Sequence, residues 1–156
     1  MKPTVIIVDD DPEVVRGITA FLESQGAFEI AGFSDPAEAE LYAKANPVDV
    51  VVADYQMPQQ DGLELLRRMK GLHPESSRIL LASRADAHSS AIDGINQVAL
   101  FQYLEKPWDD EQLLLAVQNG AERASLLRNL REKVDELDSA HNVLKGVQKR
   151  LVRAFL

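Results

Sequence analysis

Five short apolar runs recur along the first two thirds of the chain, and longer stretches of mixed polarity separate them. The runs cover residues 4–8, 28–32, 48–53, 78–82 and 101–104. Apolar runs of this length are typical of strands buried on both faces of a parallel sheet, and the stretches between them have room for helices. The pattern predicts an α/β protein with a doubly wound, five-stranded parallel sheet.

Aspartate and proline mark the expected starts of three helices. A polar side chain can cap the first turn, while proline is tolerated at the first helical position. The candidate caps are Asp11 before Pro12, Ser34 or Asp35 before Pro36, and Asp109 or Asp110 after Pro107. The helix expected over 86–96 is the weakest, because it contains serine, glycine, asparagine and aspartate, which are poor helix formers.

The segment from Glu111 to Leu156 contains no proline and shows a seven-residue apolar repeat. Leucines recur at one position of the repeat, and mostly apolar residues occupy the adjoining seam position. The first set is Leu130, Leu137, Leu144 and Leu151, and the second is Leu127, Val134, His141, Gln148 and Phe155. The pattern predicts a long coiled-coil helix over 123–156, after a first domain over 1–122.

In coiled-coil notation the leucine set occupies the d positions of the heptad, and the second set occupies the a positions. Leucine at each d position, with leucine or valine at the early a positions, favours a parallel homodimer. His141 and Gln148 on the a seam would weaken this interface while fixing its register, and Lys133 could pair with Asp138 of the other copy. A long antiparallel helical hairpin or packing within the chain is the alternative. We also expect the helix to lead to an output domain beyond Leu156.

Composition narrows the class of protein. The chain has 156 residues, no cysteine and a formal charge of −8. It has no apolar stretch of membrane-spanning length and no signal segment, so we expect a soluble cytoplasmic protein without membrane contact. Residues 1–108 hold 9 Lys and Arg against 17 Asp and Glu, so nucleic-acid binding is not expected of this acidic region.

Charged residues follow three of the apolar runs. Asp9 and Asp10 follow the first, Asp54 follows the third and Lys106 follows the fifth. The carboxyl ends of parallel strands share one edge, so these groups should gather in one crevice. Clustered carboxylates repel one another unless a cation lies between them, and Mg²⁺ suits an acidic site that must also admit phosphate. Asp54 would be the nucleophile that forms an aspartyl-phosphate, with Lys106 as a second cation.

With these motifs the chain resembles the receiver domain of two-component response regulators over roughly its first 120 residues. The matching motifs are Val8-Asp9-Asp10, Asp54-Tyr55-Gln56-Met57-Pro58 followed by Asp61-Gly62, Leu81-Ala82-Ser83, and Tyr103-Leu104-Glu105-Lys106-Pro107. The resemblance implies a flavodoxin-like strand order. It also implies a domain that catalyses only its own phosphorylation and dephosphorylation, with a sensor histidine kinase or phosphotransfer protein as partner.

The resemblance also assigns roles to single residues. Asp54 is the implied phosphoacceptor, and Ser83 and Lys106 are implied to contact the phosphoryl oxygens. Tyr103 is the implied aromatic switch, acting together with Ser83. The implied Mg²⁺ ligands are Asp9, Asp10, Asp54 and the backbone carbonyl of Gln56. Ser83 stands where the family more often has threonine, which preserves the hydroxyl, and the Lys106-Pro107 bond is expected to be cis.

Two other functional classes fit parts of the sequence. A haloacid-dehalogenase-like phosphatase would use Asp9 as nucleophile and Asp11 two residues later, and a structural coiled-coil adaptor would need only the C-terminal helix. The receiver is favoured over both alternatives because the chain has the complete set of pocket residues, Asp9, Asp10, Asp54, Ser83 and Lys106. The output stays open among cyclic-di-GMP phosphodiesterases of the HD type, diguanylate cyclases, kinases and AAA+ activators, because fold-level resemblance does not separate them.

Overall fold

A computed structural model of the chain describes residues 2–155, except 85–97. Five parallel strands form one sheet in the order β2-β1-β3-β4-β5. The strands are β1 (Thr4–Val8), β2 (Glu29–Phe33), β3 (Val50–Asp54), β4 (Ser77–Ala82) and β5 (Gln102–Glu105). This confirms the predicted doubly wound sheet and its flavodoxin-like order, with the order reversing between β1 and β3.

The apolar runs predicted the strands to within two residues. The second run begins with Phe28, but β2 begins at Glu29, and the third begins with Val48, but β3 begins at Val50. Phe28 and Val48 are buried in the core just before their strands. Their apolar character therefore reflects packing rather than strand pairing.

The described helices are α1 (Pro12–Ser24), α2 (Pro36–Ala45), α3 (Gly62–Leu72) and α6 (Asp110–Phe155). Asp11 caps α1 by accepting from the Glu13 amide, and Asp35 caps α2 by accepting from the Ala37 amide, with proline first in each helix. Asp109 Oδ1 likewise accepts from the Glu111 amide at the start of α6. The helix expected over 86–96 lies outside the described residues.

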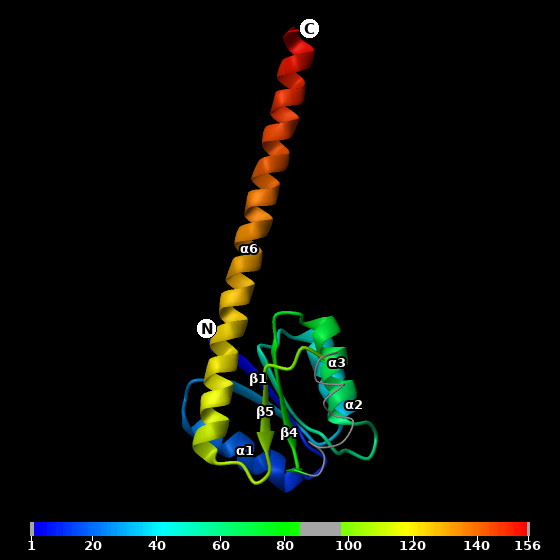
Figure 1. The fold of residues 1–156 in the computed structure, drawn as a ribbon, viewed down its shortest axis with the longest axis vertical. Coiled ribbons are helices and arrows are strands. Elements are labelled where there is room, and N and C mark those ends of the chain that lie inside the picture. Colours follow the sequence, from blue (N-terminus) through cyan, green and yellow to red (C-terminus); the bar gives the residue numbers. More distant parts are fainter. Residues whose placement is uncertain (1, 85–97, 156) are drawn as a thin grey trace. The chain divides into compact units, whose positions relative to one another are not determined.

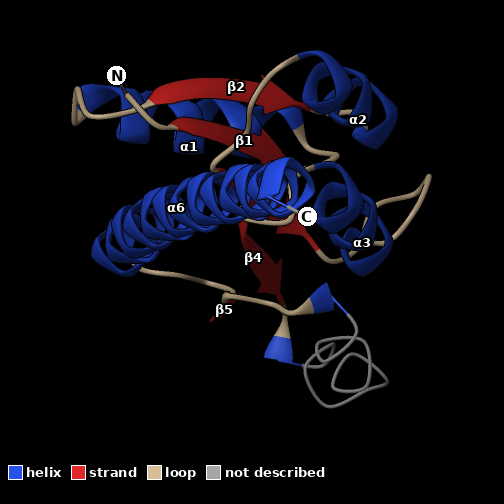
Figure 2. Cartoon of the chain, turned by 90° about the horizontal axis from the view of Figure 1, so that it is seen from above, coloured by secondary structure: helices blue, strands red, loops and turns tan. Residues whose placement is uncertain are grey.

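Alternate residues of the strands face opposite layers of helices. One face packs α1 and the first part of α6 against side chains such as Val5, Ile7 and Val52. The other face packs α2 and α3 against Ile6 and Val51. Figures 1 and 2 show α2 and α3 together on one side of the sheet and α1 on the other. The sheet is buried on both faces, which explains why its strands read as nearly continuous apolar runs.

The chain divides into two compact units, Met1–Ala124 and Ser125–Leu156. Helix α6 is continuous from Asp110 to Phe155, so the antiparallel hairpin considered from the sequence is wrong. Its first turns belong to the first unit, where Leu113, Ala116 and Val117 are fully buried. No described helix is long and apolar enough to cross a membrane.

Candidate functional site

Asp54 ends the central strand β3 and is buried, with 3% of its surface exposed. Its Oδ1 atom lies 2.5 Å from Lys106 Nζ, which comes from the residue directly after β5. The two groups are 52 residues apart in sequence, and the parallel sheet brings them together. The predicted pairing of a carboxylate and an ammonium at the carboxyl edge is therefore present.

Asp9 and Asp10 follow β1, the neighbour of β3. One carboxylate oxygen from each of Asp9, Asp10 and Asp54 lies within 4.8 Å of the other two. Asp9 is buried and Asp10 is exposed, so the cluster reaches from the protein interior to the solvent. Three converging carboxylates with one open side suit a hard divalent cation that keeps some of its water ligands.

Burial raises the pKa of the Asp9 carboxyl to about 6. The backbone amide of Asp11, 2.9 Å from Asp9 Oδ1, opposes this effect by stabilising the charged form. The negative charge of Asp54 raises the pKa further, and Lys106 lowers it. The pocket thus carries more negative charge than its own cation neutralises, which is the electrostatic condition for binding a further cation.

A glycine allows the loop after β3 to approach the site. Gly62 begins α3, and its amide donates to the carbonyl of Tyr55 at 2.8 Å. A Cβ atom added to Gly62 would overlap the backbone carbonyl of Asp54 and lie 3.1 Å from Leu80 Cδ1. Asp61 caps the helix by accepting from the Glu64 amide. Close packing therefore explains the Asp61-Gly62 pair, which the sequence offered only as a motif.

Ser83 and Tyr103 lie on the β4 and β5 side of the sheet. Ser83 directly follows β4 and is half-buried. The Tyr103 hydroxyl is 3.4 Å from the Ser83 carbonyl and 3.5 Å from the Ala82 carbonyl, long distances for O–H donors. The Lys106 amide donates to the Ala82 carbonyl, and the Lys106-Pro107 bond is cis, as the resemblance implied. The proposed switch residues are thus neighbours.

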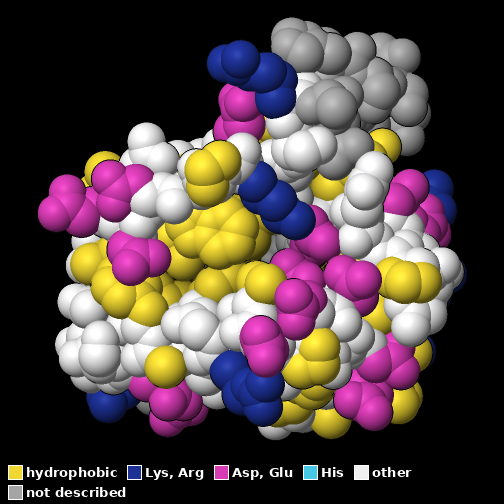
Figure 3. All heavy atoms as spheres, turned by 90° about the horizontal axis from the view of Figure 1, so that it is seen from below, with side chains coloured by type: hydrophobic (Ala, Val, Ile, Leu, Met, Phe, Trp, Pro, Cys, Tyr) yellow, Lys and Arg dark blue, Asp and Glu magenta, His cyan; other side chains and the backbone are white. Residues whose placement is uncertain are grey.

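Gln56 lines a shallow pocket beside the acidic cluster, together with Asp10, Tyr55, Met57, Pro58 and Asp61. Asp11, which the phosphatase alternative required as a second acid, is exposed and caps α1 instead. Figure 3 views the end toward which β5 points, where acidic side chains gather in the middle beside a basic one.

Arg78 is a buried residue that the sequence analysis did not single out. It is 2% exposed, and its guanidinium donates to the carbonyls of Val98 and Ala99 and to Ser76 Oγ. In the sequence, the only sign of this role is that Arg78 is a charged residue at the start of an apolar run, a position that by itself indicates only a strand boundary. Arg78 fixes the segment that leads into β5, the strand that carries Tyr103 and precedes Lys106.

The predicted seam residues lie far from this pocket along the sequence, on the second unit and its border. Leu127 is half-buried, and the seven seam residues from Leu130 to Leu151 are exposed. Five of them are large exposed apolar residues, and these make up half of the large exposed apolar residues of α6: Leu130 at 61% exposure, Val134 at 47%, Leu137 at 70%, Leu144 at 61% and Leu151 at 52%. These exposed fractions refer to one copy of the chain, without a partner helix against α6.

Comparison with known proteins gives a consistent result. Residues 5–118 match the response regulator receiver domain family. The chain is 28% identical over 144 residues to the hydrogenase transcriptional regulatory protein HoxA of Cupriavidus necator, covering 92% of this chain and 29% of that protein. The chain therefore spans about a third of the length of this relative.

Two solved structures have similar folds. The receiver domain of an HD domain-containing protein from Pseudomonas fluorescens Pf-5 is 30% identical, with a TM-score of 0.74 over 82% of this chain and 93% of that chain. A structure described as an adenylate cyclase from Rhodopirellula baltica has a TM-score of 0.80 over 86% of this chain and 98% of that chain. Its 23% identity supports similarity of fold alone.

Proposed function

The chain belongs to the response regulator receiver domain family, and on this premise we propose that Asp54 is its phosphoacceptor. The observation that carries the proposal is the buried Asp54 carboxylate, 2.5 Å from Lys106 and grouped with Asp9 and Asp10. The donor would be a phosphohistidine of a sensor histidine kinase or phosphotransfer protein. An Asp54 oxygen forms the new bond to phosphorus as the nitrogen–phosphorus bond breaks, and the imidazole leaves with a proton.

The acidic cluster suits Mg²⁺ as the cofactor. Asp9, Asp10, Asp54 and the Gln56 backbone carbonyl would hold the ion, since they offer oxygen ligands around one open side. When bound, Mg²⁺ supplies positive charge that offsets the carboxylates and the phosphoryl oxygens. Lys106 contributes a second positive charge that reaches Asp54 from the opposite flank of β3.

Phosphorylation would be transmitted through Ser83 and Tyr103. The Ser83 hydroxyl would move toward the phosphoryl group, and Tyr103 would turn into the space behind it. The Tyr103 hydroxyl lies 3.5 Å from the Ala82 carbonyl and 3.4 Å from the Ser83 carbonyl, so the two residues of this proposed switch are neighbours. The receiver is itself the phosphoryl acceptor in this reaction, so we do not class the chain as an enzyme acting on other substrates.

We assign 1–122 to the receiver domain and 123–156 to a parallel dimeric coiled coil that leads to an output domain. The exposed apolar row on α6 supports this assignment, because such a row is stable in water when a partner helix covers it. Regulation of transcription, which the name of the HoxA relative states for that protein, and the cyclic-di-GMP turnover considered from the sequence are candidate output classes. We place the protein in the cytoplasm, where its kinase partner would act.

Phosphorylation with acetyl phosphate and Mg²⁺ tests the pocket. Wild type should gain one hydroxylamine-labile phosphoryl group on Asp54, and Asp54→Asn should gain none. Asp11→Asn is the matched control, because asparagine also caps helices and Asp11 is essential only in the phosphatase alternative. A label mapped to Asp9, or lost in Asp11→Asn, would contradict Asp54 as the phosphoacceptor.

A further inference from the structure

The second unit carries more exposed apolar residues than a single heptad repeat accounts for. Val143, Val147 and Val152 are 63%, 40% and 54% exposed, alongside the leucines at the d positions. Val147 would be a g residue and Val143 a c residue in the uninterrupted repeat, whereas His141 and Gln148 would hold the buried a positions. In the C-terminal half, the apolar residues and the heptad therefore disagree.

A single three-residue step in the repeat places Val147 on the seam and Val143 at the flanking g position, whereas Val152 stays off the seam at a b position. Leu127, Leu130, Val134 and Leu137 follow the heptad spacing of three and four residues. Ala140 comes three residues after Leu137, and the spacing then continues through Leu144, Val147, Leu151 and Ala154. Every member of this shifted seam is apolar. The uninterrupted repeat gains Phe155 at its last a position, but it places His141 and Gln148 inside the interface.

We propose that α6 pairs with a second copy of this chain through the shifted seam, with a three-residue discontinuity between Leu137 and Ala140. Such an insertion locally overwinds a coiled coil. His141 and Gln148 then lie at e positions on the flank of the interface, where polar side chains can keep contact with water. The inference deepens the proposed dimer and rests on it.

The charges on α6 favour a second copy as the occupant. In a parallel pair before the step, Lys133 of one copy faces Asp138 of the other, and the symmetric contact brings opposite charges together twice. Such complementarity within one sequence is expected of self-association.

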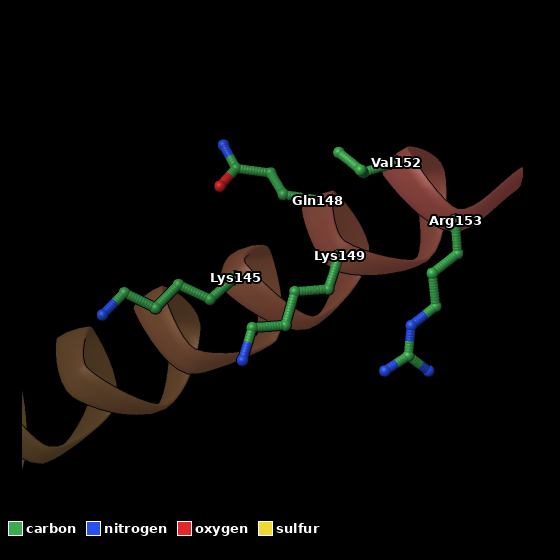
Figure 4. Close-up of a pocket in the computed structure, with 5 residues that line it drawn as sticks. All are labelled: Lys145, Gln148, Lys149, Val152 and Arg153. Carbon is green, nitrogen blue, oxygen red and sulfur yellow. The ribbon is translucent and has the colours of Figure 1, made fainter. Parts of the chain in front are cut away.

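The basic residues after the three-residue discontinuity also fit pairing with a second copy through the shifted seam. A groove on the helix surface is lined by Lys145, Gln148, Lys149, Val152 and Arg153. In the view of Figure 4, Lys149 and Arg153 extend downward from the helix, whereas Gln148 and Val152 extend upward. The shifted seam moves Lys145 from an e position to a b position, so the cations of the two copies point away from each other.

Cysteine cross-linking distinguishes the two registers, since the chain contains no cysteine. Residues at a or d face their own counterparts in a parallel dimer, whereas e and g residues do not. Ala140→Cys and Val147→Cys should form disulfide-linked dimers at least about fivefold faster than His141→Cys and Gln148→Cys. Leu137→Cys and Leu144→Cys are positive controls, because both positions lie on the seam in either register.

The possible outcomes distinguish an error in the shifted seam from an error in the proposed parallel dimer. Faster linking at positions 141 and 148 overturns the shifted seam and leaves the uninterrupted dimer in place. If neither Leu137→Cys nor Leu144→Cys forms a disulfide-linked dimer, the parallel homodimer itself is wrong. A second measurement uses apolar substitution: the dimer dissociation constant of a His141→Ile, Gln148→Leu double variant should stay within about twofold of wild type. Tightening of tenfold or more would place these residues in the interface and contradict the shifted seam.

Discussion

The Ser77 hydroxyl donates a hydrogen bond of 2.6 Å to the backbone carbonyl of Gly120. It ties the first residue of β4 to α6, and Arg123 Nη1, one turn further along the helix, lies 3.3 Å from the Ser76 carbonyl and from Ser77 Oγ. Gly120 allows the close approach, since an added Cβ would lie only 3.1 Å from Ser77 Cβ. The attachment of α6 to the receiver therefore depends on a glycine that helix propensity alone would disfavour.

Removing the Ser77 hydroxyl should destabilise the receiver. Ser77→Ala leaves the buried Gly120 carbonyl without this donor, at an expected cost of about 1–2 kcal/mol in the free energy of unfolding. Ser24→Ala is the matched control, because Ser24 makes a hydrogen bond of the same length, 2.6 Å, to the Phe21 carbonyl at an exposed site. Urea denaturation should show a loss below about 0.5 kcal/mol for the control. Equal losses would contradict the role of burial.

Two glycines of the same helix should respond oppositely to alanine. Gly71→Ala in α3 meets no atom within 4 Å, so it should stabilise the protein by about 0.5–1 kcal/mol. Gly62→Ala would collide with the Asp54 carbonyl and should cost roughly 1–3 kcal/mol. The displacement of Asp54 should also slow phosphorylation by acetyl phosphate roughly tenfold or more. A Gly62→Ala protein with normal stability and rate would refute this packing argument.

The raised pKa of Asp9 predicts how the stability of the metal-free protein depends on pH. The folded protein holds the Asp9 proton up to about pH 6, whereas an unperturbed carboxyl releases it near 3.8. The stabilising contribution is therefore complete below pH 3.8 and lost as the pH rises to about 6. Its size should be roughly 1–3 kcal/mol.

The measurement compares wild type with Asp9→Asn in chemical denaturation from pH 4 to 7 with a chelator present. The difference between the two free energies of unfolding should favour wild type less as the pH rises. Mg²⁺ at pH 7 should then stabilise wild type more than Asp9→Asn, because the ion binds the charged cluster. An unchanged difference across this pH range would show that burial does not perturb Asp9.

Tyr103 should couple the pocket to the arrangement of the dimer. A beryllofluoride mimic of the phosphoryl group should change the distances between spin labels on the two receivers while the mass of the dimer stays constant. A shift between two populations requires a difference in binding free energy of only a few kcal/mol. Tyr103→Leu should suppress the change. Tyr42→Leu is the control, because Tyr42 packs against Phe33 on another part of the sheet. Unchanged distances in a protein that binds the mimic would make the coil a passive tether.

The sequence alone determined the parts of this protein that depend on local patterns. Apolar runs located the strands, because a strand buried on both faces has little room for polar side chains. Aspartate and proline located the starts of α1 and α2, because capping acts within a few residues. Asp9, Asp54 and Lys106 stand at or just after the carboxyl ends of β1, β3 and β5. They were therefore expected at one edge of the sheet, because the carboxyl ends of parallel strands share that edge.

Tertiary structure decided what depends on distances between remote residues. It made Gly62 and Gly120 points of close contact, buried the Arg78 guanidinium against Val98 and Ala99, and brought Ser77 to α6. It also raised the pKa of Asp9, since that shift comes mainly from the surroundings that bury the side chain. None of these follows from spacing along the chain, because each depends on which atoms the packed helices bring against the sheet.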